Sequence, residues 1–406
     1  MNIIRKIYCR VFQEVFHMAI PFLPYRKPAI LDSVMALPGL FKDKDIKSVL
    51  LVTDKSIRGF GITKGLEDAL RDNGINVAVY DSTVANPTTD NVEEARKLYI
   101  AAGCQAIIGF GGGSSIDAAK AVGARIAYPK KPLAKMEGIL KVLRRIPLLI
   151  AVPTTAGTGS ETTLASVIVD SRTRHKYPIN SFPLIPRYAV LDPETTRTLP
   201  PSITATTGLD ALTHAVEAFI GRSTTKETRS DAIEAVKLIF ANIEKAYKDG
   251  NDMVARRSML RAAFLAGSAF TKSYVGYVHA VAHSLGGKYN TPHGLANAVL
   301  LPYVLDYYGK SAWKKLAALA EAVGISGRSD EDKAKVFISE IRRIEGNLRI
   351  PATLPEVREE DIDELSAYAD KEANPLYPVP RLMGKEELRV FYRMVMAKEK
   401  NHTATA

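Results

Sequence analysis

Side chains that can bind a metal recur at helical spacing in two parts of this chain. Asp210 and His214 lie four residues apart, which places both on one face of a helix. His279 and His283 repeat that spacing on a second predicted helix, and His293 follows in a predicted loop between a proline and a glycine. An aspartate and several histidines are donors that zinc or ferrous iron accepts. The pattern therefore predicts a catalytic divalent metal.

Each of these pairs could also be structural, either as a solvated Asp–His pair or as a histidine that fills space in an apolar helix. The chain has only seven histidines, however, and four of them fall in these two segments. Their neighbours in sequence are mostly apolar, so burial without a shared partner would cost roughly 1–3 kcal/mol for each unsatisfied polar group. A metal is the simplest shared partner.

Two loops of small residues follow predicted strands. The strand at 106–110 leads into the glycine-rich segment 111–117 and then a helix, and residues 153–160 form the second loop. Backbone amides in such loops, together with a helix N-terminus, favour a pyrophosphate. Asp54, at the end of the first strand, could bind a ribose hydroxyl and disfavour a 2′-phosphate, or it could be a surface residue. Because Asp54 precedes the glycines, this is not the usual dinucleotide fingerprint.

The order of strands and helices predicts two domains. Up to about residue 195, short apolar runs alternate with helical patterns, which indicates βαβ units and a mainly parallel sheet. The expected strands are 48–52, 77–80, 106–110 and 148–152, and the expected helices between them are 64–72, 91–103 and 115–124. Residues 168–170 are expected to start a hairpin that ends near 188–191.

From Pro201 onward the periodic segments have helical spacing, and paired prolines place the domain boundary at 199–201. The expected helices of this all-α part are 205–220, 226–247, 253–272, 277–286, 311–323 and 330–344. The resulting division is an N-terminal extension over 1–28, an α/β NAD(P)-binding domain over 29–199, and an all-helical metal-binding domain over 200–400. Residues 401–406 are expected to be disordered.

Composition predicts a cytoplasmic globular protein. A chain of 406 residues is too long for one ordinary core. Its two cysteines, Cys9 and Cys104, form no disulfide framework, which fits a reducing cytosol. The net charge of +11 comes without a nucleic-acid motif, so no nucleic-acid partner is expected. No segment approaches the ~20 apolar residues of a membrane span.

The N-terminal extension carries apolar residues at helical spacing, interleaved with basic ones. It lacks the uninterrupted apolar run and the cleavage site of a signal peptide. An amphipathic helix of this kind can touch a membrane surface. Packing on the body of the protein or on a second subunit is the preferred interpretation.

Long motifs in both predicted domains resemble those of the iron-containing (group III) alcohol dehydrogenases, in the same order, from about residue 30 to 395. The matching segments are Phe110–Lys120, Pro153–Glu161, Thr207–Glu217, Gly276–Gly286 and Thr291–Gly294, together with Asn86-Pro87 and Leu191–Pro193. The implied fold is the one shared with dehydroquinate synthase, with the site in the cleft between an α/β nucleotide-binding domain and an all-α domain.

The resemblance also implies roles for single residues. Asp210, His214, His279 and His293 fall on the metal ligands, for Fe(II) and in some members zinc. His283 falls on an extra histidine near the nicotinamide, a position suited to proton relay or to filling space beside the metal. The residues at positions implied to bind the cofactor are Asn86, Gly112, Gly113, Ser114, Asp117, Thr154, Thr155 and Lys176, with Asp54 favouring NAD(H) over NADP(H).

The implied activity is hydride transfer between NAD(P)(H) and a small alcohol or aldehyde, in a homodimer or larger homo-oligomer. Three alternatives remain open: a polyol oxidoreductase like glycerol dehydrogenase, a lyase like dehydroquinate synthase, and a non-catalytic assembly protein of the same fold. Lys272 and Tyr274 depart from the run of small apolar or amide-bearing residues that many relatives carry. Both could favour a polar or acidic substrate, or could point to solvent.

Overall fold

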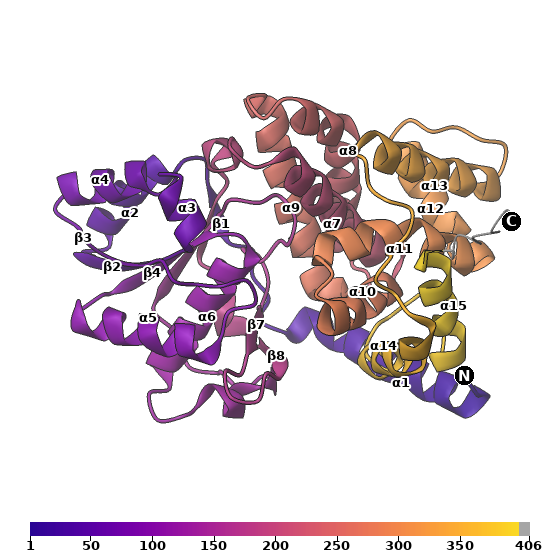
Figure 1. Cartoon of the computed structure of the whole chain (residues 1–406), viewed down its shortest axis with the longest axis horizontal. Coiled ribbons are helices and arrows are strands. Elements are labelled where there is room, and N and C mark those ends of the chain that lie inside the picture. The colour runs from indigo at the N-terminus through magenta and orange to yellow at the C-terminus, as the bar shows by residue number, and fades with distance from the viewer. Residues whose placement is uncertain (398–406) are drawn as a thin grey trace, which may run out of the picture.

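A computed structural model describes residues 1–397 and shows a sheet with helices on both sides, followed by a helical part (Figure 1). The predicted disorder of residues 401–406 and the last three residues of the predicted 200–400 domain lie outside the described residues. The predicted fold class, a mainly parallel sheet followed by an all-helical part, is confirmed.

The main sheet has six strands in the order β1-β9-β6-β4-β2-β3, and every neighbouring pair is parallel. Its strands are β1 (Ala29–Leu31), β2 (Ser48–Val52), β3 (Asn76–Tyr80), β4 (Ala106–Gly111), β6 (Leu148–Pro153) and β9 (Tyr188–Val190). Its helices are α2 (Leu37–Asp43), α3 (Lys55–Gly59), α4 (Lys64–Asp72), α5 (Thr89–Ala101) and α6 (Gly113–Ala127). Because helices cover both faces of the sheet, β2 and β4 are buried along their whole length, which explains their unbroken apolar sequences.

The predicted hairpin ending near 188–191 is wrong in its second strand. β7 (Ala165–Val169) pairs antiparallel with β8 (Lys176–Asn180) in a small second sheet that also contains β5 (Gly138–Ile139). β9 instead joins the main sheet between β1 and β6. β8 was missed because it has only five residues and its central position is a proline, Pro178, which argues against a strand.

The helical part begins at Pro201, after the last strand ends at Val190. Its helices are α7 (Pro201–Ile220), α8 (Lys226–Lys248), α9 (Met253–Ser273), α10 (Tyr277–Tyr289), α11 (His293–Tyr308), α12 (Trp313–Ala322), α13 (Asp330–Asn347), α14 (Ile362–Ala373) and α15 (Lys385–Val395). We propose that the domain boundary lies at 199/200, at this change from strands to helices.

The prediction that His293 lies in a loop is wrong, because His293 is the first residue of α11. The helix is apolar around most of its circumference and contains Pro302, so its sequence shows little helical periodicity. A proline directly before the first helical residue and a helix buried on most sides are both compatible with this sequence. His293 is therefore held by a helix terminus rather than by a loop.

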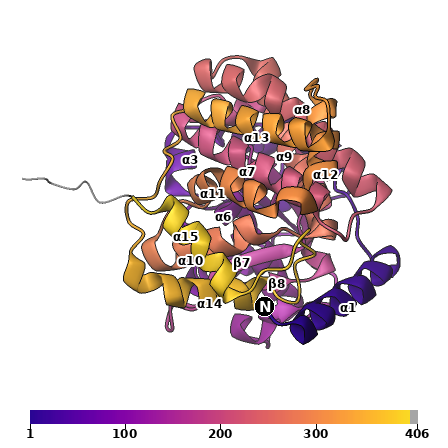
Figure 2. The same ribbon diagram turned by 90° about the vertical axis from the view of Figure 1, so that its right-hand side faces the viewer.

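An N-terminal helix, α1 (Ile3–Ala19), lies along the outside of the helical part (Figures 1 and 2). One side of it is attached to the segment before α15, where Gln13 donates hydrogen bonds to the carbonyl oxygens of Pro375 and Tyr377. Among the described residues, no helix is both long enough and apolar enough to cross a membrane.

Candidate metal centre

Four predicted metal donors, which come from three helices, meet at one point. Asp210 and His214 lie on α7, His279 on α10, and His293 at the start of α11. One donor atom from each of the four lies within 4.8 Å of the others. The Asp210 Oδ1 atom is 3.4 Å from His293 Nε2 and 4.0 Å from His279 Nε2. Helices far apart in sequence thus place an oxygen and three imidazole nitrogens around a common centre.

The three imidazoles are held in their neutral form. Burial lowers the pKa of His214, and burial together with the neighbouring imidazoles lowers that of His279 far below its usual range. Burial also lowers the pKa of His293 to about 4, and the nearby His283 and His214 act in the same direction. Only a neutral imidazole has the free lone pair that a metal needs.

The cluster contains more hydrogen-bond acceptor atoms than N–H groups that can donate to them. The Asn297 side-chain amide donates to Asp210 Oδ1 over 2.7 Å, and its nitrogen is 3.2 Å from His279 Nε2 and 3.1 Å from His293 Nε2. An amide has only two N–H groups for these three acceptors. In addition, His214 Nδ1 is buried without a hydrogen-bond partner. A divalent cation would satisfy this surplus of lone pairs, so the donor set fits a metal.

Glu217, which the sequence did not single out, orients one of the donors. Its carboxylate is 2.7 Å from His279 Nδ1 and accepts hydrogen bonds from the backbone N–H groups of Gly276 and Val278. A proton on His279 Nδ1 leaves the lone pair of Nε2 directed at the centre. Burial raises the pKa of Glu217 to about 7, although its three hydrogen-bond partners favour the ionised form. A Cβ atom at Gly276 would lie 2.6 Å from Glu217 Oε1, so glycine is required there.

His283 lies beside the donors without joining the group of four. Its ring stacks on that of His293, with centroids 5.1 Å apart and an interplanar angle of 18°. His283 Nδ1 is 2.6 Å from Glu372 Oε1, and the Tyr377 hydroxyl donates to the same oxygen over 2.7 Å. Burial disfavours the charged form of this imidazole. The charge of the Glu372 carboxylate and its hydrogen bond together outweigh that effect and raise the pKa of His283. Neither Glu372 nor Tyr377 was identified from the sequence, because only the fold brings α14 beside α10.

The glycine-rich loop between β4 and α6 packs closely against its surroundings. A Cβ atom at Gly111 would lie 2.6 Å from Ser115 Oγ, and one at Gly113 would lie 3.1 Å from Thr158 in the second loop. Asp54 follows β2 at the same edge of the sheet, with its Oδ2 only 3.6 Å from that Gly111 position. Asp54 also caps α3 by accepting from the Ile57 N–H over 2.9 Å.

Three predicted cofactor residues from different elements are linked by hydrogen bonds. The Asn86 backbone N–H donates to Ser114 Oγ over 3.3 Å, and Lys176 Nζ donates to Asn86 Oδ1 over 2.6 Å. Loss of hydration lowers the pKa of Lys176, while Asp117 and Glu372 favour its charged form. Lys176 is thus influenced by Glu372, the same carboxylate that contacts His283.

The second loop contributes Thr154 and Thr155. The Thr154 N–H donates to the Gly111 carbonyl oxygen over 3.0 Å, and its buried hydroxyl has no hydrogen-bond partner. The Thr155 side chain would be 3.7 Å from a Cβ atom at Gly112. Both threonines therefore lie against the glycine-rich loop, as expected if the two loops bind one ligand.

The Asp117 carboxylate is hydrogen bonded to other groups of the protein. It accepts hydrogen bonds from Ser160 Oγ over 2.6 Å and from the Val167 N–H over 3.0 Å, and burial raises its pKa. The buried Lys120 amine donates to Ser160 and Thr163, and burial lowers its pKa to about 8. This network ties α6 to the loop after β6. A direct contact of Asp117 with a cofactor stays a prediction.

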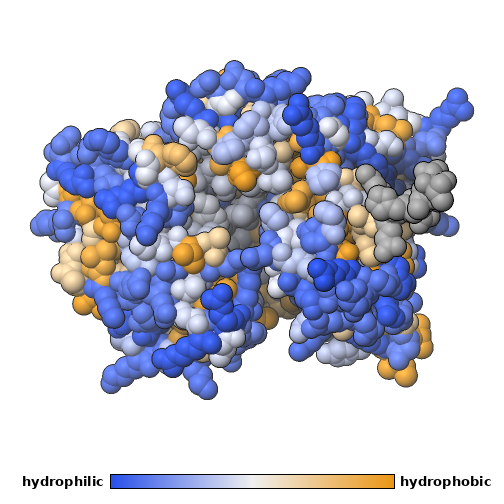
Figure 3. Space-filling model, in the orientation of Figure 1, coloured by the Kyte–Doolittle hydropathy of each residue, from blue (hydrophilic) through white to orange (hydrophobic). Residues whose placement is uncertain are grey.

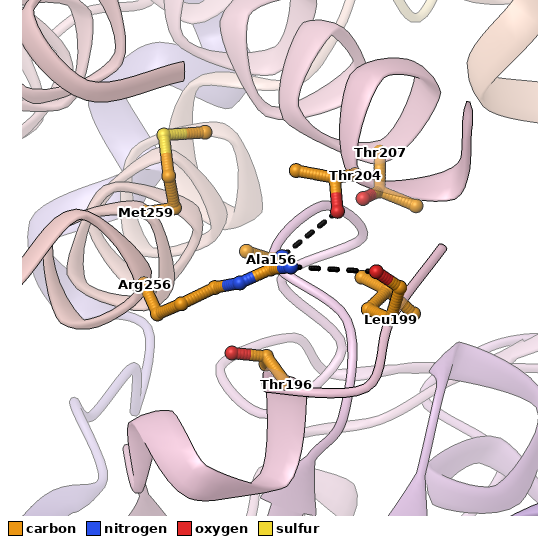
Figure 4. Close-up of a pocket in the computed structure, with 7 residues that line it drawn as sticks. All are labelled: Ala156, Thr196, Leu199, Thr204, Thr207, Arg256 and Met259. Carbon is orange, nitrogen blue, oxygen red and sulfur yellow. Dashed lines mark hydrogen bonds between the residues drawn. The ribbon is translucent and has the colours of Figure 1, made fainter. Parts of the chain in front are cut away.

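The loop after β6 also packs on the helical part. A small pocket at this junction is lined by Ala156, Thr196, Leu199, Thr204, Thr207, Arg256 and Met259 (Figure 4). Arg256 spans it and donates to Thr204 Oγ1 over 2.8 Å and to the Leu199 carbonyl oxygen. None of the four metal donors lines this pocket, so we assign it a structural role.

Lys272 and Tyr274 have structural partners. Lys272 forms an ion pair of 2.6 Å with Glu227, and Tyr274 packs edge-on against Phe16 of α1, with ring centroids 5.3 Å apart. These contacts do not support the hypothesis that the two residues select an acidic substrate.

Comparison with known proteins covers both parts of the chain. Residues 31–193 match the family model described as iron-containing alcohol dehydrogenase, and residues 204–396 match the Fe-containing alcohol dehydrogenase family, C-terminal. The 1,3-propanediol dehydrogenase of Klebsiella pneumoniae is 38% identical over 355 residues, which span 86% of this chain and 91% of the relative. The NAD-dependent methanol dehydrogenase of Bacillus methanolicus is 35% identical over 327 residues, or 80% and 86% of the two chains.

A solved structure agrees over nearly the whole length. The crystal structure of a 1,3-propanediol oxidoreductase superposes with a TM-score of 0.87 at 34% identity, covering 92% of this chain and 98% of that one. The likeness includes both the parallel sheet and the helical part.

Proposed function

This chain belongs to the iron-containing alcohol dehydrogenase family and is a metal-dependent alcohol oxidoreductase, and we propose that it transfers hydride between NAD(H) and a small alcohol or aldehyde. The observation that carries the proposal is the convergence of Asp210, His214, His279 and His293 on one centre. The surface is hollowed between the sheet and the helical part (Figure 3), where a cofactor and a substrate could meet.

We propose that Asp210, His214, His279 and His293 hold Fe(II), with Zn(II) as the alternative, because imidazole and carboxylate donors accept both ions. Such an ion supplies Lewis acidity toward the oxygen of an alcohol or a carbonyl group. The protein provides neutral imidazoles, and Glu217 keeps the His279 lone pair directed at the centre. Asn297 donates to Asp210 and fixes the orientation of that carboxylate.

The two loops and Lys176 are proposed to bind the cofactor. Backbone amides at Gly112 and Gly113 open α6, and a helix N-terminus favours the negative charge of a pyrophosphate. Bound NAD(H) supplies the hydride acceptor or donor. Lys176 lies near Glu372, which holds His283, so the nicotinamide end of the ligand is expected on the side of the metal centre.

Replacing Asp54 with serine is expected to weaken the preference for NAD(H). A carboxylate beside the glycine-rich loop accepts a ribose hydroxyl and repels a 2′-phosphate. Serine also caps helices, so α3 should be preserved. The ratio of kcat/KM for NADH to that for NADPH should fall by roughly tenfold, which corresponds to about 1.4 kcal/mol. The same change at Asp252, which caps α9, is the control; an unchanged ratio in Asp54→Ser would refute the role of Asp54.

Replacing His283 with glutamine should slow turnover without releasing the metal. His283 stands outside the four donors but beside them, held by Glu372, where it can exchange a proton with solvent. A positioned acid or base contributes roughly 100-fold or more to a rate, so kcat should drop by about that factor while metal content stays near one per chain. His17→Gln, on α1, is the matched control. Unchanged turnover would leave His283 with a space-filling role only.

The activity itself is tested by NADH oxidation with anaerobically purified, Fe(II)-loaded protein and a panel of short aldehydes. Turnover that is abolished by a chelator and restored by Fe(II) is the expected result. Stoichiometric metal with no net NADH consumption would favour the lyase-like alternative, which uses NAD only transiently. Turnover restricted to polyols would favour the alternative that resembles glycerol dehydrogenase, and absence of bound metal would favour an assembly protein.

We further propose that the enzyme is cytoplasmic and forms a homodimer or larger homo-oligomer. Cys9 and Cys104 are buried and unpaired, as expected in a reducing compartment. Light scattering coupled to gel filtration measures the assembly directly, and a monomeric mass at micromolar concentration would contradict the proposal.

A further inference from the structure

The N-terminal helix α1 presents its polar side to the protein. Gln13 is 3% exposed and Arg10 is partly buried, and both donate hydrogen bonds to backbone carbonyl oxygens in the segment 375–380. Arg5 forms an ion pair of 2.7 Å with a carboxylate of α14. Cys9, on the same side, is 1% exposed. Hydrogen bonds and an ion pair therefore hold much of this helix in place.

The opposite side of α1 is apolar and faces solvent. Nine large apolar side chains of this segment are between 37% and 88% exposed. They are Ile3, Ile4, Ile7, Tyr8, Val11, Phe12, Val15, Met18 and Phe22, which we call the outer face. At about 100° per residue the members within the helix spread over roughly half of its circumference, opposite Cys9 and Gln13. A surface helix normally turns its apolar side inward, so this orientation is reversed.

A contiguous apolar surface of this size on a single helix indicates a binding partner. Figure 2 shows α1 at the edge of the molecule, and Figure 3 shows hydrophobic residues at the lower right, near its N-terminal end. The helix lies outside the segments that match the family, which begin at residue 31. The outer face is thus an addition to the common fold, remote in sequence from the catalytic residues.

The shape of this segment and the charge of the whole chain select the partner. A second helix packed against α1 would cover a narrow apolar stripe, and could not cover both Ile3 and Phe12 at opposite edges of the outer face. A lipid surface can cover the entire half-cylinder. Arg5 and Arg10 face the protein and Lys27 is ion-paired with Asp231, so these side chains do not select the lipid. The net charge of +11 on the whole chain favours an anionic surface over a neutral one.

We propose that α1 binds the surface of an anionic lipid membrane, lying in the plane of that surface with its outer face inserted and the enzyme held on the aqueous side. Tyr8, toward one edge of the face, suits the boundary between acyl chains and headgroups because its ring is apolar and its hydroxyl is polar. The segment 375–380 that α1 contacts includes Tyr377, which is hydrogen bonded to Glu372 beside His283.

The test is co-sedimentation of the full-length protein with vesicles of phosphatidylcholine, with and without phosphatidylserine. The double variant Ile7→Glu/Val11→Glu places two charges in the middle of the outer face, where both side chains already contact solvent. The control, Val254→Glu/Val336→Glu, makes the same change at two exposed valines of α9 and α13. We expect binding to the anionic vesicles that weakens with added salt, a loss of at least about tenfold in the α1 variant, and little change in the control.

Three outcomes would overturn the proposal. The first is wild-type protein that does not sediment with anionic vesicles. The second is equal loss of binding in both double variants, which would mean that overall charge and not the outer face is responsible. The third is a wild-type protein that does not bind vesicles but forms an oligomer, if that oligomer dissociates in the α1 variant and not in the control. This result would assign the outer face to a second copy of the chain. Unchanged turnover of soluble substrate verifies that each variant is folded.

Discussion

Replacing Asp210 with asparagine is expected to abolish metal retention and to lower turnover by roughly 1,000-fold, because Lewis-acid stabilisation is worth several kcal/mol and about 1.4 kcal/mol corresponds to a factor of ten. Asp210 is the only oxygen donor among the four residues. Asparagine would keep its size and its buried position on α7 while removing the charge that balances a divalent ion. Metal content by mass spectrometry and NADH-linked turnover measure the two effects.

The loss of metal should also appear in stability. A ligand that binds only the folded state raises its stability by an amount that grows with concentration relative to Kd, so a chelator should lower the Tm of wild-type protein and leave that of Asp210→Asn unchanged. Asp252→Asn is the control, because asparagine also caps a helix and Asp252 lies at the start of α9. Stoichiometric metal in Asp210→Asn would exclude this carboxylate as a ligand.

Replacing Glu217 with glutamine is expected to weaken metal binding by roughly 10- to 100-fold, the usual effect of losing a group that orients a metal ligand. The carboxylate accepts from two backbone N–H groups and from His279 Nδ1. A glutamine amide has one accepting oxygen, and its NH2 group would face a donor. The His279 ring would then lose the contact that directs its Nε2 lone pair inward. Competition with a chelator of known affinity gives the metal Kd.

Glu345→Gln provides a matched control for Glu217→Gln. Glu345 is another buried glutamate of the helical part, on α13, and burial raises its pKa to about 8. The change at Glu345 should leave the metal Kd unchanged, whatever its effect on unfolding. If Glu217→Gln binds metal as tightly as the wild type, the Glu217 contact is structural and does not serve the metal centre.

Local periodicity in the sequence was sufficient for most of the helices and for the central strands. The apolar runs of β2 and β4 predicted buried parallel strands because both faces of that sheet are covered. α11 was missed because it is apolar on most sides and so shows little helical periodicity. β8 was missed because a proline interrupts its alternating pattern. Periodic patterns appear when the two sides of an element meet different surroundings, whereas a strand buried on both sides is recognised from a short apolar run.

The sequence by itself determined which residues could serve a metal and a dinucleotide, since spacing along a helix and glycines after a strand are local properties. Only the tertiary structure determined which other residues contact them. No local pattern distinguishes Glu217, Glu372 and Asn297 from other polar residues, and they lie beside the metal donors and His283 because α7, α10, α11 and α14 pack together. The same holds for α1, whose amphipathic sequence shows two faces but not which one turns outward. Contacts between distant segments depend on how whole helices pack, and no local pattern encodes that choice.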